Sequence, residues 1–257
     1  MKLGLTTYNV AAKWDLGTII TTCEKLGYEG VELRTSHAHG VEVSLSKRER
    51  AEVRKRFEGS AVKLVGLSSA FEYHSTDAKE LARNIEGTKE YVELARDVGA
   101  EGVKVRPNGF VQGVPREKTI AQIGDGLREV GEFARGHGVK IRLEVHGEGT
   151  CHPPVVKEML ARADHPNVFA CWNSNMTDLD ETSRIDKYFG MLKEYIEIVH
   201  INELWTKYPW ERLFFLLEEA KFEGYCLAEI GESADAERLL SYYRALFRAL
   251  ERNARGR

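Results

Sequence analysis

The chain has 257 residues, with 37 lysines and arginines against 40 aspartates and glutamates, and its formal net charge at pH 7 is −3. It therefore has no basic excess that would attract a nucleic acid, and no apolar run reaches the ~20 residues that a membrane span requires. The length is close to the ~250 residues of a single (β/α)8 barrel, so we expect residues 1–257 to form one domain.

Short β-branched or aliphatic segments alternate eight times with longer amphipathic segments, which is typical of βα units around a parallel sheet. The predicted strands are 2–7, 29–34, 62–68, 101–106, 139–146, 167–173, 197–202 and 225–230. The predicted helices are 16–26, 46–57, 77–98, 116–137, 153–163, 183–195, 209–220 and 233–253. Glycines before several strands, namely Gly27, Gly99, Gly138 and Gly224, are expected to end the preceding helices. The pattern predicts an α/β fold, a single (β/α)8 TIM barrel.

Charged residues occupy alternate positions of several predicted strands. Arg142, Glu144 and His146 share one face, as do Glu32 with Arg34 and Lys104 with Arg106. The intervening positions are apolar and should pack against the helices, so the charged face should point into the barrel. Buried charges are costly unless they are paired or bind a ligand. For Glu32, Lys104 and Arg142, a structural ion-pair network and a functional role remain equally good interpretations.

Four polar residues lie one each at the ends of four successive predicted strands. They are Glu144, Asn173, His200 and Glu229, spaced by 29, 27 and 29 residues. Because active sites of parallel barrels lie at the carboxyl ends of the strands, these side chains should converge on one rim. Two carboxylates, an imidazole and an amide oxygen are suitable ligands for a divalent metal.

The four cysteines show no CxxC spacing, which suits a reducing compartment, and Met1 leads directly into the first predicted strand without room for a signal peptide. We therefore expect a soluble, cytoplasmic protein.

The whole chain resembles the xylose isomerase-like barrels, which include sugar phosphate isomerases and epimerases and AP endonucleases. The resemblance rests on Gly30-Val-Glu-Leu-Arg34, Val199-His200 and Ala228-Glu229, together with a glutamate ending the fifth strand. It implies that Glu144, Asn173, His200 and Glu229 bind a divalent cation such as Mn²⁺, Mg²⁺, Zn²⁺ or Co²⁺. It also implies that Glu144 and Glu229 are the acid/base pair acting on a sugar or sugar phosphate.

The sequence departs from the family pattern at two points. The sixth-strand motif, commonly Asp-x-x-His, reads Asn173-Ser-Asn-Met176, so a carboxylate and an imidazole are missing. An amide oxygen can coordinate hard cations but brings no charge, so metal affinity should fall. The additional histidines that multi-zinc endonucleases need are also not matched, which disfavours AP endonuclease activity.

Four further residues are candidates for substrate binding. His146 should face the same cavity as Glu144 and contact a substrate hydroxyl or support the metal ligands. Arg34 and Arg106 could bind a phosphate or carboxylate, or balance the charge of Glu32 or Glu72. Asn175, like Asn173, could bind substrate or cap the following turn.

These observations lead to one principal hypothesis and two alternatives. The principal one is a metal-dependent sugar or sugar-phosphate isomerase or epimerase that acts through an enediolate. The alternatives are a keto-polyol dehydratase or lyase on the same site, and a metal-free barrel that binds a sugar without turnover. The sequence leaves open whether the chain forms a homo-oligomer.

Overall fold

In a computed structural model of the protein, residues 1–256 are described. Eight parallel strands form a closed barrel in chain order, with β8 returning to pair with β1. The strands are β1 (Lys2–Thr6), β2 (Gly30–Arg34), β3 (Lys63–Glu72), β4 (Gly102–Arg106), β5 (Lys140–Glu144), β6 (Val168–Trp172), β7 (Ile196–Ile201) and β8 (Tyr225–Ala228). The predicted (β/α)8 TIM barrel is confirmed.

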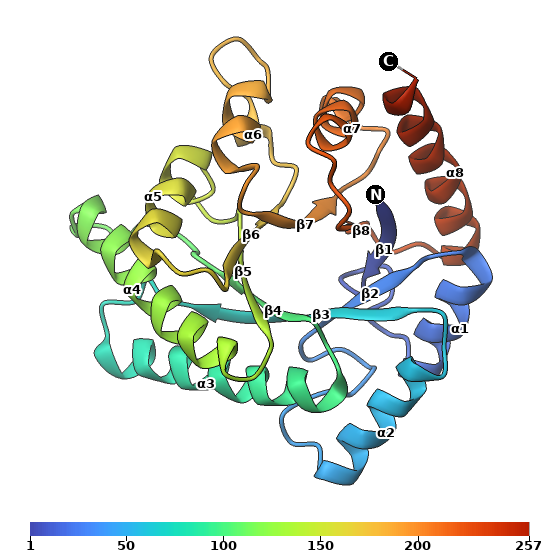
Figure 1. Cartoon of the computed structure of the whole chain (residues 1–257), viewed down its shortest axis with the longest axis horizontal. Helices are drawn as coiled ribbons and strands as arrows, with labels where there is room; N and C mark the ends of the chain where they lie inside the picture. Colours follow the sequence, from blue (N-terminus) through green and yellow to red (C-terminus); the bar gives the residue numbers. More distant parts are fainter. Residues whose placement is uncertain (257) are drawn as a thin grey trace.

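Helices alternate with the strands and surround the barrel (Figure 1). They are α1 (Leu16–Leu26), α2 (Lys47–Glu58), α3 (Ala78–Val98), α4 (Arg116–Arg135), α5 (Pro153–Ala163), α6 (Asp186–Leu192), α7 (Trp210–Glu219) and α8 (Ala236–Arg255), with a short 3-10 helix at Met176–Asp178 before α6. Within residues 1–256, no helix combines the length and the apolar character needed to cross a membrane.

Most boundaries differ from the prediction by a few residues, and some of the differences have a local physical cause. Strand β3 continues to Glu72 because it resumes pairing with β4 after a register shift. Helix α6 is shorter than expected because Asp180 accepts backbone hydrogen bonds from Thr182 and Arg184, which form a turn before it. Gly224 does not cap a helix, since α7 already ends at Glu219.

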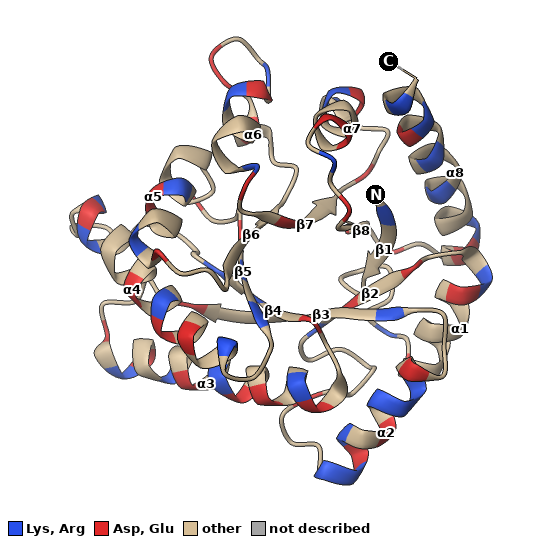
Figure 2. Ribbon diagram, viewed as in Figure 1, with Lys and Arg blue, Asp and Glu red and all other residues tan. Residues whose placement is uncertain are grey.

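The two faces of the sheet have opposite character. Outward-facing residues such as Val31, Val103 and Ile141 are fully buried against the helices in the main hydrophobic core. The alternate residues point into the barrel, and five of them are charged or titratable although at most 3% exposed: Glu32, Lys104, Arg142, Glu144 and His200. Figure 2 shows that charged residues cover the outer helices and also occur on strands such as β4 and β7.

Arg142 neutralises the amino-terminal part of the barrel interior. Its guanidinium forms an ion pair with Glu197, and Nη1 donates to the carbonyl oxygen of Val65 at 2.7 Å. Two glycines on neighbouring strands leave the space that it occupies. A Cβ atom at Gly66 would lie 2.7 Å from Arg142 Nη1, and one at Gly102 would lie 2.8 Å from Arg142 Cζ. The buried guanidinium therefore requires glycine at both positions, because a side chain at either one would occupy its space.

A second buried polar group joins the loops that follow β6 and β7. Tyr208 donates a hydrogen bond of 2.8 Å to Asp178 Oδ2, and Trp172 Nε1 donates to Tyr208 Oη at 3.1 Å. Asp178 is fully buried, and burial raises its pKa to about 7, against the lowering effect of the Tyr208 hydrogen bond. Tyr208 and Asp178 thus join the two loops through a carboxyl group whose ionisation is opposed by burial.

The Arg142 arrangement predicts that Gly102→Ala destabilises the protein by about 1–3 kcal/mol, because the added methyl group forces the guanidinium away from Glu197. Gly190→Ala is the matched control, since a Cβ atom there meets no atom within 4 Å, and it should be neutral or slightly stabilising. Urea unfolding of both variants measures the difference. Equal stability of the two variants would contradict this account of the barrel interior.

Asp178 predicts a pH dependence of stability. Its pKa is higher in the folded chain than the ordinary 3.8, so its contribution is fully present below pH 4 and is lost as pH rises through about 7. The shift corresponds to roughly 4 kcal/mol. The stability of Asp178→Asn relative to wild type should therefore increase between pH 4.5 and pH 8. A difference that stays constant over this range would show that Asp178 does not titrate in this way.

Candidate functional site

A cavity of about 510 Å³ opens at the carboxyl ends of the strands. Seven of the eight site residues predicted from the sequence line it: Arg34, Arg106, Glu144, His146, Asn173, Asn175 and Glu229. The eighth, His200, is 1% exposed and contacts two of the others. Strand geometry explains this convergence, because each residue ends a strand or lies within two or three residues of its end.

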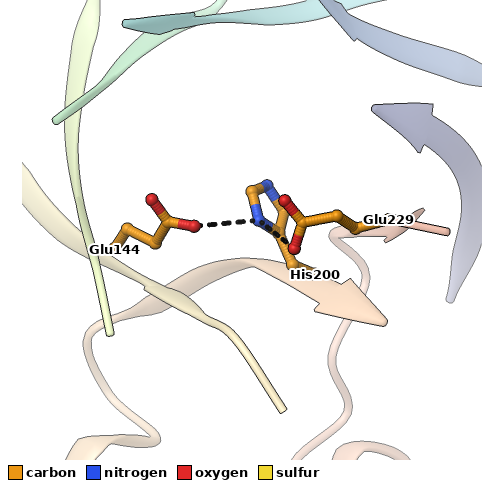
Figure 3. Close-up of side chains that lie close together, drawn as sticks. All are labelled: Glu144, His200 and Glu229. Carbon is orange, nitrogen blue, oxygen red and sulfur yellow. Dashed lines mark ion pairs between the residues drawn. The ribbon is translucent and has the colours of Figure 1, made fainter. Parts of the chain in front are cut away.

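Glu144, His200 and Glu229 form the centre of the site (Figure 3). His200 Nδ1 lies 3.5 Å from Glu144 Oε1 and 3.6 Å from Glu229 Oε2. One ligand atom from each residue lies within 4.8 Å of the others, which is a spacing that a single metal ion can bridge. These residues come from β5, from β7 and from the position directly after β8.

Glu32 orients the imidazole from the opposite side. His200 Nε2 lies 2.9 Å from Glu32 Oε2, and both side chains are at most 1% exposed. With a proton on Nε2 donated to Glu32, the lone pair of Nδ1 faces Glu144 and Glu229, as in metal-binding histidines supported by a carboxylate. Burial lowers the pKa of His200, but Cys171, Glu229 and Glu32 together raise it well above its ordinary value. The imidazole therefore binds a proton or another cation strongly.

Glu144 is held as a carboxylate by Lys104. The two side chains form an ion pair in which each is 4% exposed. Burial raises the pKa of Glu144, but Lys104 and His200 hold it far below its ordinary range. Neither Arg106 nor Arg142 pairs with Glu144, because Arg106 pairs with Glu72 and Arg142 with Glu197.

Glu32 is paired inside the barrel, but not with an arginine. Neither Arg34 nor Arg142 lies within ion-pair distance of its carboxylate among residues 1–256, and His200 takes that place. The suggestion that Glu72 balances an arginine is confirmed for Arg106.

The two asparagines after β6 differ in their contacts. Asn173 is 6% exposed, and its Oδ1 is buried without a hydrogen-bond partner among residues 1–256. Asn175 donates from Nδ2 to the carbonyl oxygen of Val145 at 2.5 Å, so its amide is fixed by the backbone of a neighbouring strand rather than by capping a turn. Because buried polar atoms are normally hydrogen-bonded, the Asn173 oxygen is available to a group bound in the cavity.

Other cavity residues were not proposed from the sequence as site residues. They include Lys104, for which the sequence left a structural and a functional role equally open, and also Tyr8, Ser68, Asn202 and Glu203. Lys104 lies two residues before Arg106 on the same face, and Asn202 and Glu203 directly follow β7. Most of these residues lie at or just beyond a strand end, which is the same signal that predicted Glu144 and Glu229.

Comparison with known proteins agrees with this architecture. The profile of the xylose isomerase-like TIM barrel family matches residues 20–248. No curated protein matches the chain in sequence.

Several solved structures share the fold at low sequence identity. The IolI protein with a bound zinc atom has a TM-score of 0.80 at 20% identity, with 98% of each chain covered. An L-ribulose 3-epimerase has a TM-score of 0.83 at 17% identity, covering 99% of this chain and 96% of its own. The probable 3-DHS dehydratase AsbF from Bacillus anthracis has a TM-score of 0.72 at 15% identity, covering 96% of this chain and 99% of its own. From the extent of the family match, this chain belongs to the xylose isomerase-like TIM barrel family.

Proposed function

We propose that the protein is a divalent-metal-dependent isomerase or epimerase of a sugar or sugar phosphate. The observation that carries the proposal is the meeting of Glu144, His200 and Glu229 at the carboxyl ends of three strands, with their ligand atoms within 4.8 Å of one another. The family and the epimerases among its solved members support an enzyme of this kind.

The donor set fits a metal ion. Nδ1 of His200 and Oδ1 of Asn173 are both buried without hydrogen-bond partners among residues 1–256, and the carboxylates of Glu144 and Glu229 lie beside the imidazole. These four groups would hold the cation. When bound, it would act as a Lewis acid that makes the hydrogen alpha to a substrate carbonyl more acidic.

The two glutamates differ in a way that suggests their roles. Glu144 is fixed by Lys104, and its side chain is 4% exposed. The side chain of Glu229 is 18% exposed, and no lysine or arginine pairs with it among residues 1–256. We assign the proton abstraction to Glu229, because its carboxylate is freer to approach the substrate.

The proton balance then follows from the position of the two carboxylates. Glu229 takes the hydrogen from the carbon next to the carbonyl, and the substrate becomes an enediolate. Return of the proton from Glu229 to the neighbouring carbon, with a proton passing from one oxygen of the enediol to the other, gives an isomer. An epimer requires a proton on the opposite face of the same carbon. Glu144 would deliver that proton after taking it from the Lys104 ammonium group that donates to its Oε2, and exchange with solvent would then return a proton to Lys104 and remove the one on Glu229. Lys104 would stabilise the negative charge of the enediolate beside it.

A dehydratase on the same residues is the second candidate, since the same enediolate can expel a hydroxyl group from the adjacent carbon. The similarity of fold to the probable 3-DHS dehydratase AsbF favours retaining it. Product mass separates the two reactions, because isomerisation conserves mass and dehydration removes one water.

A barrel that binds a sugar without a metal is the remaining candidate. It is motivated by Asn173, which brings no charge, and by the Lys104 ammonium, which already supplies a cation beside Glu144. Metal analysis of the purified protein and calorimetric titration with Mn²⁺ test it. Binding of Mn²⁺ would reject this candidate, and its absence would reject metal dependence.

Glu229→Gln should reduce kcat on the ketose that the metal-loaded protein turns over fastest by roughly a hundredfold or more, because amide nitrogen and oxygen do not accept the proton. The same variant should lose exchange of the substrate hydrogen with D₂O, measured by NMR. Glu232→Gln, an exposed glutamate three residues further on, is the control and should retain both activities. Full turnover by Glu229→Gln would refute the assignment of the base.

Asn173→Asp should raise the affinity for Mn²⁺ by roughly tenfold or more, because it adds a negative charge at the unpartnered Oδ1 position. Asn175→Asp is the matched control. Its amide is turned toward Val145, so a carboxylate there should leave Mn²⁺ affinity nearly unchanged. Calorimetric titration measures both. An equal gain in the two variants would mean that only general cavity charge matters and that Asn173 is not a ligand.

A further inference from the structure

The cavity has two halves of different chemistry. Glu144, His200 and Glu229 occupy the half formed by β5, β7 and β8, where we place the reacting carbons. The opposite half is formed by β2, β3 and β4, whose ends pair in register from Arg34 to Ser68 and from Ser68 to Lys104. Three basic residues line that half, namely Arg34, Lys104 and Arg106.

Two of the three basic groups already have carboxylate partners. Lys104 pairs with Glu144, and Nη2 of Arg106 pairs with Glu72, which also accepts a hydrogen bond from Asn108. Arg106 nevertheless keeps its Nε buried without a hydrogen-bond partner among residues 1–256.

Arg34 differs from both. Its guanidinium makes one long contact, from Nη1 to the carbonyl oxygen of Ser68 at 3.5 Å. Among residues 1–256 no carboxylate lies within 4 Å of it. A half-buried guanidinium without a counter-ion gives up part of its hydration for no internal compensation, which is costly unless a ligand supplies the charge.

The backbone of Arg34 is fixed on both sides. Its N–H donates to Thr7 Oγ1 at 2.9 Å, and its carbonyl oxygen lies 2.8 Å from Nε2 of His39. Both His39 and Thr7 are buried. The side chain thus starts from a rigid position at the end of β2 while its charged end is left without a partner, an arrangement suited to binding rather than to stabilising the fold.

We propose that the substrate carries an anionic group, a carboxylate or a phosphate, and that Arg34 binds it. Arg106, which lines the same half of the cavity two strands away, adds positive charge although Glu72 pairs with it. The substrate would lie across the cavity with its charged end toward β2 to β4 and its carbonyl end toward Glu144 and Glu229. The orientation of the reacting end rests on the proposed function, whereas the recognition of the anion rests on the Arg34 side of the cavity alone. A guanidinium fork matches the oxygens of either anion, so the two are distinguished by experiment.

The test uses unreactive six-carbon polyols that differ in the group at one end of the chain: neutral D-sorbitol, D-gluconate with a carboxylate, and D-sorbitol 6-phosphate with a phosphate. Calorimetric titration of the wild-type protein should show that one of the two anionic polyols binds roughly tenfold to a hundredfold more tightly than D-sorbitol, the range expected for a charge-assisted hydrogen bond. Tighter binding of D-gluconate would identify the substrate as a sugar acid, and tighter binding of D-sorbitol 6-phosphate would identify it as a sugar phosphate.

Arg34→Gln should abolish this preference while leaving the affinity for D-sorbitol within about twofold, and Arg34→Lys should retain part of it. Arg54→Gln, on the outer helix α2, is the control and should keep the full preference. The proposal is overturned when the wild-type protein binds all three polyols equally, or when Arg34→Gln keeps the preference.

Failure of this inference is distinguishable from failure of the proposed function. A preference for an anionic polyol that depends on Arg34, in a protein that exchanges no substrate hydrogen with D₂O, would reject the isomerase and retain the anion site. Turnover of neutral ketoses by Arg34→Gln at the wild-type kcat/KM, with no preference among the polyols, would retain the isomerase and reject the anion site.

Discussion

The hydrogen bond between His200 and Glu32 crosses the interior of the barrel and joins residues 168 positions apart in the chain. It fixes which nitrogen of the imidazole faces Glu144 and Glu229, and so it decides whether the three groups can share a ligand. Neither group could remain buried alone, since an isolated charge or unpaired imidazole is costly in a barrel interior. Lys104 and Arg142 complete the balance of charge from the neighbouring strands. The small residues at Gly66 and Gly102 are a consequence of this arrangement, because the guanidinium of Arg142 needs their space.

The fold could be predicted because its signals are local. Apolar residues recur with period two along the strands and with the helical period between them, and these patterns depend only on nearby residues. The predicted ends of β5 and β6 accordingly lie within two residues of the observed ones. The residues of the cavity could be predicted for the same reason, since a strand end is a position in the sequence. The partners of the buried charges could not. Whether Glu144 meets Lys104 or Arg106 depends on which side chain reaches it across the barrel, and periodicity contains no such information.

The wrong predicted end of β3 affects the interpretation of the arginines in the cavity. The prediction ended β3 at residue 68, whereas the strand continues to Glu72 and brings that residue into register with Arg106. Their ion pair neutralises one of the two arginines that the sequence offered for anion binding. Arg34 has no carboxylate partner, because the residue beside it on β3 is Ser68, which accepts a hydrogen bond only through its carbonyl oxygen. The extent of a single strand therefore separates two residues that looked equivalent in the sequence.

Two features make the charge of the site more positive. Asn173 replaces the carboxylate expected after the sixth strand, and Lys104 contacts Glu144. The cluster of Glu144, Glu229 and Lys104 has one net negative charge, so a divalent cation would leave it with one net positive charge. With a third carboxylate and no lysine, the same cation would leave the cluster negative. A positive centre stabilises an enediolate more strongly and attracts an anionic substrate from solution. The loss of a carboxylate would weaken the hold on a metal and, by the same change of charge, would favour a negatively charged substrate. The weak point of the proposed metal site and the unpaired Arg34 thus have a common electrostatic explanation.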